Sequence, residues 1–336
     1  MKILIAGIRD VGGNAYNLAH AINKLTDHQA INLRAQSTYI NFPCIADMGN
    51  YSMQQCRKMF YEADVIVFQS TLKPFFEGLG INKRKLKDKK NLLWCMGTEW
   101  RYGRKYLMQH TDFFLGNNHQ ILLGGSAMFF PGEDEEKTPC PPDAKWLPPV
   151  KSFSEISRRY NLCNQDQTAL KSFATPKKKV VFCHAPTSEQ KKGSPMFYRA
   201  VTQAMHALPD MSFLTIANRP WRSCLSLIAG SDVLLDQAPP FPVGYGAISI
   251  EASIFKLPVV TQIAPECIRW LKEQTGLDSP FVTFTDEEDL LAKIYRIAVD
   301  PKLRRILGTL NYKFCKAIHD EKPVVDRFLK ILEEMD

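Results

Sequence analysis

The segment 231–261 restricts the possible fold more than any other part of this sequence. An apolar run at 233–235 predicts a strand that ends at Asp236, and a loop rich in proline and glycine leads into a helix-like apolar run at 248–255. A second short apolar run follows at 258–260. A strand, a loop, a helix and a strand within about thirty residues are what a parallel βαβ unit requires.

The loop of this unit and the start of its helix form the first candidate binding site. Tyr245, Gly246 and Ala247 come directly before the expected helix. Glycines there let backbone N–H groups approach an anion, and the helix dipole favours negative charge, which suits the diphosphate of a nucleotide. Glu251 follows one helical turn later, where its carboxylate can accept hydrogen bonds from the vicinal hydroxyls of a ribose. The other interpretation is a glycine-rich turn and a surface glutamate in an ordinary α/β protein, and both stay open at this point.

The first half of the chain begins with the same order of elements. The residues at 2–6 predict a strand, a loop with Gly7, Gly12 and Gly13 follows, and apolar residues at helical spacing predict a helix at 15–24. The glycine spacing is not that of a dinucleotide-binding GxGxxG loop, and the sequence has no P-loop GK[ST] motif. A dinucleotide or ATP is therefore a less favoured ligand.

Strands alternate with helices through both halves, which predicts an α/β protein whose parallel sheets are covered on both faces. Because the chain has 336 residues, two domains are expected. Six prolines between 131 and 150 mark the end of the first domain, since a helix or a central strand does not continue through them. We place a Rossmann-like domain at 1–165, a second one at 166–320 and a C-terminal helix at 321–336 that can cross back to the first. Two such domains are expected to face a cleft and to bind ligands at the carboxyl ends of their strands.

The composition limits the cellular compartments and the kinds of cysteine site that are expected. Hydrophobic residues make up 45% and charged residues 23% of the chain, and no run of eighteen apolar residues occurs. The N-terminal apolar run is too short for a signal peptide, so we expect a cytoplasmic protein. Nine cysteines are scattered without a CxxC pair, which argues against a disulfide framework and against a structural zinc site.

The formal net charge is +8, and much of the excess is local, in the basic run 83–90. Such a run is usually a solvated face or a linker. The alternative is a basic surface that contacts anionic lipid head groups or nucleic acid.

Three stretches of the second half, taken in order, resemble the donor-binding domain of GT-B retaining glycosyltransferases of the nucleotide-sugar-dependent group 1, or family 4. They are 184–187 with Lys192 and Gly193 downstream, 231–237, and 245–260. The first half is similar in a looser way, at 12–14 and at 97–101, the latter matching a loop that faces the acceptor. The resemblance implies the GT-B fold and transfer of a sugar from a nucleotide donor to an acceptor hydroxyl.

The resemblance also implies roles for single residues. Glu251 would hold the ribose of a UDP- or GDP-sugar, and Lys192 would neutralise the diphosphate with the help of backbone donors at Gly246 and Ala247. No metal is expected to be essential, because fixed cations and N–H dipoles stabilise the leaving nucleoside diphosphate. Gly12 and Gly13 would close over the donor from the first domain, and the remaining members of the candidate set are Tyr245 on the donor side and Glu99, Arg101 and His184 as catalytic residues.

Purely structural roles for the same residues also stay open. His184 could be a loop histidine satisfied by the backbone, and Glu99 and Arg101 could form a surface ion pair. Lys192 could be exposed to solvent. Asp236 could be a turn-capping side chain.

The sequence departs from the family pattern at positions that contact the donor sugar and phosphate. Val243 stands where members commonly have a glutamate, Met96 where a histidine is frequent, and Thr187 and Ser188 where an arginine is common. A nucleotide-sugar-binding partner without turnover is therefore one alternative.

Two further alternatives concern the acceptor. A lipid-linked or surface glycan would suit membrane contact through 83–90. DNA with hydroxymethylated bases, as in phage glycosyltransferases, would suit the net positive charge.

Overall fold

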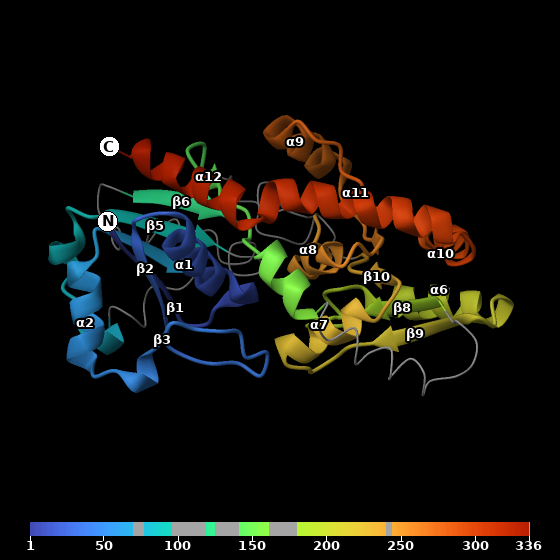
Figure 1. Cartoon of the computed structure of the whole chain (residues 1–336), viewed down its shortest axis with the longest axis horizontal. Helices are drawn as coiled ribbons and strands as arrows, with labels where there is room; N and C mark the ends of the chain where they lie inside the picture. The colour runs from blue at the N-terminus through green and yellow to red at the C-terminus, as the bar shows by residue number, and fades with distance from the viewer. Residues whose placement is uncertain (70–76, 96–118, 125–140, 161–179, 240–243, 336) are drawn as a thin grey trace. The chain divides into compact units, whose positions relative to one another are not determined.

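The computed structural model describes residues 1–69, 77–95, 119–124, 141–160, 180–239 and 244–335. The chain has an α/β fold with two Rossmann-like units, each built on a parallel sheet (Figure 1). Unit 1 consists of residues 1–151 and 319–336, and unit 2 of residues 152–318. The C-terminal segment thus returns to the first unit, as the sequence predicts.

Unit 1 contains a sheet of seven parallel strands in the order β3-β2-β1-β4-β5-β6-β7. The order reverses between β1 and β4, which pair along their length so that Gly7 lies opposite Gln69. The strands are β1 (Lys2–Gly7), β2 (Gln29–Arg34), β3 (Ala46–Asp47), β4 (Val65–Gln69), β5 (Lys90–Cys95), β6 (His119–Leu123) and β7 (Lys145–Trp146).

Helices cover both faces of this sheet, which is why its central strands are apolar on both sides. One face packs against α1 (Asn14–Leu25) and α12 (Glu321–Glu333), with Trp94 and Phe328 fully buried between them. The other packs against α2 (Met53–Glu62), which begins with a capping box. The short 3₁₀ helices of this unit are η1 (Val11–Gly13), η2 (Met48–Asn50) and η3 (Lys83–Leu86).

Unit 2 contains a sheet of four parallel strands in the order β11-β10-β8-β9. The strands are β8 (Val180–His184), β9 (Met211–Thr215), β10 (Val233–Leu235) and β11 (Val259–Val260). A core that includes Phe182 and Phe197 forms between this sheet, α6 and α10. The helices are α6 (Ser194–Ala207), α7 (Trp221–Ala229), α8 (Ala247–Ile254), α9 (Pro265–Thr275), α10 (Glu287–Val299) and α11 (Pro301–His319).

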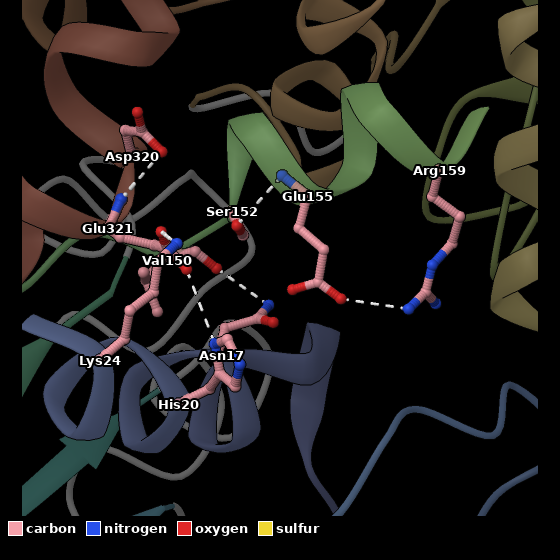
Figure 2. Close-up of polar contacts among 9 residues, drawn as sticks. All are labelled: Asn17, His20, Lys24, Val150, Ser152, Glu155, Arg159, Asp320 and Glu321. Carbon is pink, nitrogen blue, oxygen red and sulfur yellow. Dashed lines mark hydrogen bonds and ion pairs between the residues drawn. The ribbon is translucent and has the colours of Figure 1, made fainter. Parts of the chain in front are cut away.

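The points where the chain leaves and re-enters unit 1 are bonded to each other. The backbone N–H of Lys151 donates to the carbonyl of His319 at 2.8 Å, and the Nδ1 atom of His319 lies 2.9 Å from the Pro149 carbonyl oxygen. Figure 2 shows the neighbouring contacts to α1, where Asn17 donates to the Val150 carbonyl and Lys24 pairs with Glu321 of α12. The returning segment is therefore an integral part of unit 1.

The observed boundaries differ from the predicted ones at a few points. Residues 153–160 are helical and belong to unit 2, where the Phe153 ring packs edge-on against Tyr312 at 5.7 Å, so the first crossing lies at 151 and the second at 318. Beyond β11, the described part of the unit 2 sheet is extended only by a single parallel bridge between Val260 and Val282.

Candidate functional site

The candidate donor residues of unit 2 come together at the carboxyl edge of its sheet. His184 ends β8, Asp236 follows β10, and α8 begins one residue after Gly246. Because β8 and β10 are parallel neighbours, their C-terminal residues reach the same edge, as the sequence pattern predicts.

Asp236 is the centre of a hydrogen-bond network at this edge. Its buried carboxylate accepts hydrogen bonds from Lys192 Nζ at 2.8 Å, from the Gly246 N–H at 2.6 Å and from the Ser249 hydroxyl at 2.6 Å. Burial acts to raise the pKa of Asp236, but the Lys192 charge and these hydrogen bonds outweigh it and hold the pKa below its usual range. Asp236 is thus an internal anion beside the start of α8.

Lys192 is held in a fixed position beside the glycine loop. Its ammonium group also lies 3.1 Å from Gln237 Oε1, and its side chain is 19% exposed. Gly193, which follows it, has φ 62°, and a Cβ atom there would lie 2.4 Å from the Pro239 carbonyl oxygen. Only glycine lets the two loops approach this closely.

Gly246 is required at the helix start because of its neighbours. A Cβ atom on Gly246 would lie 2.7 Å from Lys192 Nζ and 2.9 Å from Asp236 Oδ2. Since the N–H of Gly246 donates to Asp236, the nearest backbone donor for a ligand among the predicted pair is Ala247, the first residue of α8.

Glu251 lies in the second turn of α8, inside unit 2. Its side chain is 4% exposed, and Oε1 accepts a hydrogen bond from Trp221 Nε1 at 2.9 Å. This bond orients the carboxylate. The ribose-binding role stays a prediction.

His184 is fully buried, and both of its ring nitrogens have partners. Nδ1 lies 2.7 Å from the Leu235 carbonyl oxygen and Nε2 lies 2.7 Å from the Ser194 hydroxyl, so Nδ1 donates and Nε2 accepts in a neutral ring. Burial lowers the pKa of His184, which favours the same neutral form. This arrangement fits a structural histidine whose hydrogen-bonding groups are paired within the protein more closely than a catalytic one. The catalytic role stays a prediction.

Tyr245 packs within an aromatic cluster of unit 2. Its ring centroid lies 4.8 Å from that of Phe281 and 6.3 Å from that of Phe314. Burial raises the pKa of Tyr245 well above its usual range, so the phenol is neutral at physiological pH.

The remaining candidates lie in unit 1 or outside the described residues. Gly12 and Gly13 form the turn before α1 with φ 70° and 69°. Glu99 and Arg101 lie outside the described residues, as do Met96 and Val243. The structure therefore brings together Lys192, Gly246 and Ala247 in one unit and leaves the acceptor-side pair undescribed.

The described ranges contain neither a candidate metal centre nor a membrane-spanning helix. Among those residues, no group of three or more His, Cys, Asp or Glu side chains could hold a metal ion. None of the helices described there is both long and apolar enough to span a bilayer.

No family model matches the sequence, and no curated protein matches it. Solved structures do match over nearly the whole chain. A glycosyltransferase from Rickettsia africae is 12% identical, covers 99% of this chain and 98% of its own, and superposes with a TM-score of 0.66. The UDP-forming α,α-trehalose-phosphate synthase from Burkholderia vietnamiensis is 10% identical, with coverage of 99% and 100% and a TM-score of 0.59.

The chain has the GT-B fold. A UDP-GlcNAc 2-epimerase from Neisseria meningitidis, bound to UDP-GlcNAc, also matches with 12% identity, coverage of 98% and 100% and a TM-score of 0.54. Because the fold is shared by transferases and epimerases, the activity has to be argued from the site.

Proposed function

We propose that this protein is a glycosyltransferase that moves a sugar from a UDP- or GDP-sugar to an acceptor hydroxyl, with retention of configuration. The observation that carries the proposal is the juxtaposition of Lys192, Gly246 and Ala247 at the carboxyl edge of the unit 2 sheet. Likeness in fold to solved glycosyltransferases supports it.

The donor diphosphate would bind between Lys192 and the first turn of α8. An ammonium group has three donors, and in Lys192 described residues use two of them, Asp236 and Gln237. The third donor and the Ala247 N–H would contact the diphosphate. A fixed cation and a helix N-terminus stabilise the charge that develops on the leaving nucleoside diphosphate.

Donor binding is tested by thermal shift against UDP-, GDP-, ADP-, TDP- and CMP-sugars, since a ligand that binds only the folded state raises the apparent stability. Stabilisation by one nucleotide family would name the base. A flat panel would reject donor binding.

The ribose contact is tested by Glu251→Gln, with the exposed Glu266→Gln as the matched control. The first substitution keeps an acceptor for Trp221 but removes the charge, so the Kd for the nucleotide sugar should rise about tenfold. The control should bind like the unmodified chain. Undiminished binding by the Glu251 variant would reject this role.

A nucleotide-sugar-binding partner without turnover is the second candidate. It is favoured by the pairing of Lys192 with Asp236, because this pairing offsets the charge meant for the diphosphate. Slow hydrolysis of the donor by the purified protein would support the transferase, whereas binding without hydrolysis would support the partner. The anomer first released, followed by NMR, tests retention.

The acceptor we propose is a lipid-linked or surface glycan that unit 1 meets at a membrane. Arg84, Lys85 and Lys87 of the basic run are exposed, whereas Lys89 and Lys90 donate to carbonyls of Tyr61 and Leu332. Each exposed cation contributes about 1 kcal/mol at an anionic surface. Replacing all three by glutamine should therefore weaken binding to phosphatidylglycerol vesicles by about a hundredfold.

Phosphatidylcholine vesicles serve as the control surface, on which the charges should have no effect. DNA with hydroxymethylated bases is the alternative acceptor that the net charge of +8 favours. Retention on such DNA at low salt, lost as salt rises, would support it over the membrane.

A further inference from the structure

The outer side of α11 is a surface of unit 2 that the proposed donor site does not use. The inner side of this helix packs on α8 and the turn after it (Figure 1), where Asn311 donates to the Leu257 carbonyl at 3.1 Å and the Cys315 thiol lies 3.4 Å from the Ser253 hydroxyl. Gly308 is buried on the same side. Because the helix repeats every 3.6 residues, these buried positions turn a fixed set of side chains outward.

The outward set combines cations with large aliphatic side chains. Its exposed members, here called the α11 face, are Lys302, Arg305, Ile306, Leu310, Lys313 and Lys316. At 100° per residue they fall within an arc of about 140°, with the cations along one side and the aliphatic pair along the other. Ile306 is 48% exposed and Leu310, one turn later, is 45% exposed.

The positive charge of the α11 face is not neutralised within the helix. Lys293 of α10 and Lys322 of α12 each pair with an aspartate one turn away, whereas the 19 residues of α11 include no Asp or Glu. Over the described ranges, no carboxylate forms an ion pair with any of the four cations of the face. The face therefore keeps its charge for a partner outside the chain.

Tyr312 borders the α11 face and lies between two cations. The Nζ atoms of Lys256 and Lys316 lie 5.4 Å and 5.6 Å from the centre of its ring. Lys256 is exposed, so it adds a further cation beside the face. Tyrosine, with an apolar ring and a polar hydroxyl, suits a boundary between water and an apolar phase.

This combination of groups fits the surface of an anionic bilayer. Lipid phosphates complement the cations, and the acyl chains beneath them take up aliphatic side chains such as Ile306 and Leu310. The phosphates of a nucleic acid would complement the same charges but leave both aliphatic side chains in water. A second copy of the face would bring like charges together. The helix is not apolar enough to span a bilayer, so it would lie on the surface.

We propose that unit 2 binds the surface of a membrane that contains anionic phospholipids through the α11 face. The inference goes beyond the proposed function, in which the membrane contact lies on the basic run of unit 1, and it does not depend on it.

The electrostatic contribution is tested by a combined Arg305→Gln, Lys313→Gln and Lys316→Gln variant. Binding of the full chain to mixed phosphatidylglycerol and phosphatidylcholine vesicles is measured by co-sedimentation, and this variant should bind about a hundredfold more weakly. The matched control replaces three exposed cations of unit 2 outside α11 by glutamine, namely Lys191, Arg199 and Arg222. The control should bind nearly as tightly as the unmodified chain, although it has lost the same net charge.

The apolar contribution is tested by Ile306→Ser combined with Leu310→Ser. This variant keeps every cation but should bind the same vesicles about tenfold more weakly, because its contact with the acyl chains is lost. Met205→Ser combined with Leu227→Ser, at exposed positions of α6 and α7, is the control and should leave binding unchanged. Binding to a nucleic acid would not respond to the loss of the aliphatic pair, so this variant separates the two partners.

Thermal stability shows whether the variants report on the surface alone. Since every substituted side chain is exposed, each Tm should stay within about 2 °C of that of the unmodified chain. If a combined variant does not fold, Lys313→Gln alone should still weaken vesicle binding about fivefold.

Equal vesicle affinities of the folded α11 variants and the unmodified chain would overturn the proposal, as would the absence of binding by the unmodified chain. Loss of binding only on replacement of the basic run 84–87 would also overturn it, because the contact would then belong to unit 1 alone. Retention on duplex DNA that depends on α11, without vesicle binding, would overturn it in favour of a nucleic acid. A flat nucleotide-sugar panel with α11-dependent vesicle binding would instead reject the proposed function and leave this surface standing.

Discussion

Asp236 and Lys192 show how strongly single charges are coupled within unit 2. Asp236 is 2% exposed, and Lys192 is the cation that balances it. Replacing one partner of a buried ion pair leaves the other charge uncompensated, which costs about 3 kcal/mol or more. Lys192→Met should therefore lower the free energy of unfolding of unit 2 by about 3 kcal/mol, measured by urea denaturation at neutral pH.

The neighbouring Lys191 is exposed, so Lys191→Met is the matched control and should change the unfolding free energy by less than about 0.5 kcal/mol. If both substitutions changed the unfolding free energy equally, the pairing of Lys192 with Asp236 would contribute nothing to stability. Donor binding by the Lys192 variant has to be measured under conditions in which the variant is folded. Unfolding would otherwise reduce binding in the same way as the loss of a contact.

His319 makes unit 1 sensitive to acid. Burial lowers its pKa to about 3, against the Pro149 carbonyl, which acts to raise it, and with the Lys151 charge, which lowers it further. Between about pH 3 and pH 6.5 the unfolded chain binds the proton that the folded chain excludes, so stability is lost as the pH falls, by up to about 1.4 kcal/mol per pH unit.

His319→Asn keeps a donor for the Pro149 carbonyl but cannot be protonated. Urea midpoints between pH 6 and pH 4 should fall less steeply for this variant than for the unmodified chain. The exposed His206→Asn is the control, and a slope that is the same in all three proteins would refute the assignment.

At the scale of elements, α11 contains a glycine, Gly308, that stabilises the fold, although glycine usually destabilises the interior of a helix. Alanine normally stabilises the interior of a helix by about 1 kcal/mol relative to glycine. A Cβ atom on Gly308, however, would lie 1.7 Å from the Lys256 carbonyl oxygen, and Lys256 already has a positive φ of 57°. Forcing a methyl group against this backbone carbonyl costs more free energy than the higher helix propensity of alanine gains.

Gly308→Ala should therefore lower the free energy of unfolding by about 2 kcal/mol, whereas Thr309→Ala on the exposed face of the same helix should be neutral or slightly stabilising. Differential scanning calorimetry of both variants tests this. A higher Tm for the Gly308 variant would mean that α11 does not pack on Lys256 as described.

The sequence predicts the elements whose periodicity is strong and misses those whose pattern is weak. The predicted helix at 15–24 is confirmed by α1, and the apolar run at 233–235 is β10. The sequence pattern does not predict β2, in which burial alternates only at the start, or α9, which begins at Pro265. Their apolar residues are too few for a periodic pattern.

The site could be predicted only as far as topology determines it. Because parallel strands end at one edge, the positions of His184 and Asp236 follow from the order of the strands. The bond from Trp221 to Glu251 joins different helices, and the carboxylate of Asp236 is paired with Lys192, 44 residues earlier in the chain. No local pattern reports such tertiary contacts.

At the scale of the whole molecule, unit 1 depends on α12. Five apolar side chains of this helix are buried in the core of unit 1, namely Val324, Val325, Phe328, Ile331 and Leu332. Each contributes about 1.5–3 kcal/mol when buried, so their sum of about 10 kcal/mol is comparable to the entire stability of a domain.

A chain truncated after Ile318 should therefore lose the protease resistance of residues 1–151 while unit 2 keeps it, as limited proteolysis with mass spectrometry would show. Phe328→Ala provides a graded control, with an expected loss of about 3–5 kcal/mol. Equal protection of unit 1 in the truncated and full chains would contradict the division described above.

The return of the C-terminal segment also sets the order of folding during synthesis. Unit 2 lies in sequence between the two parts of unit 1, so the ribosome makes it in full before residues 319–336 emerge. At about 5–20 residues per second this takes on the order of 10 to 30 s. Throughout that time the apolar face that α12 later covers is open to chaperones, and the first unit to begin is the last to be finished.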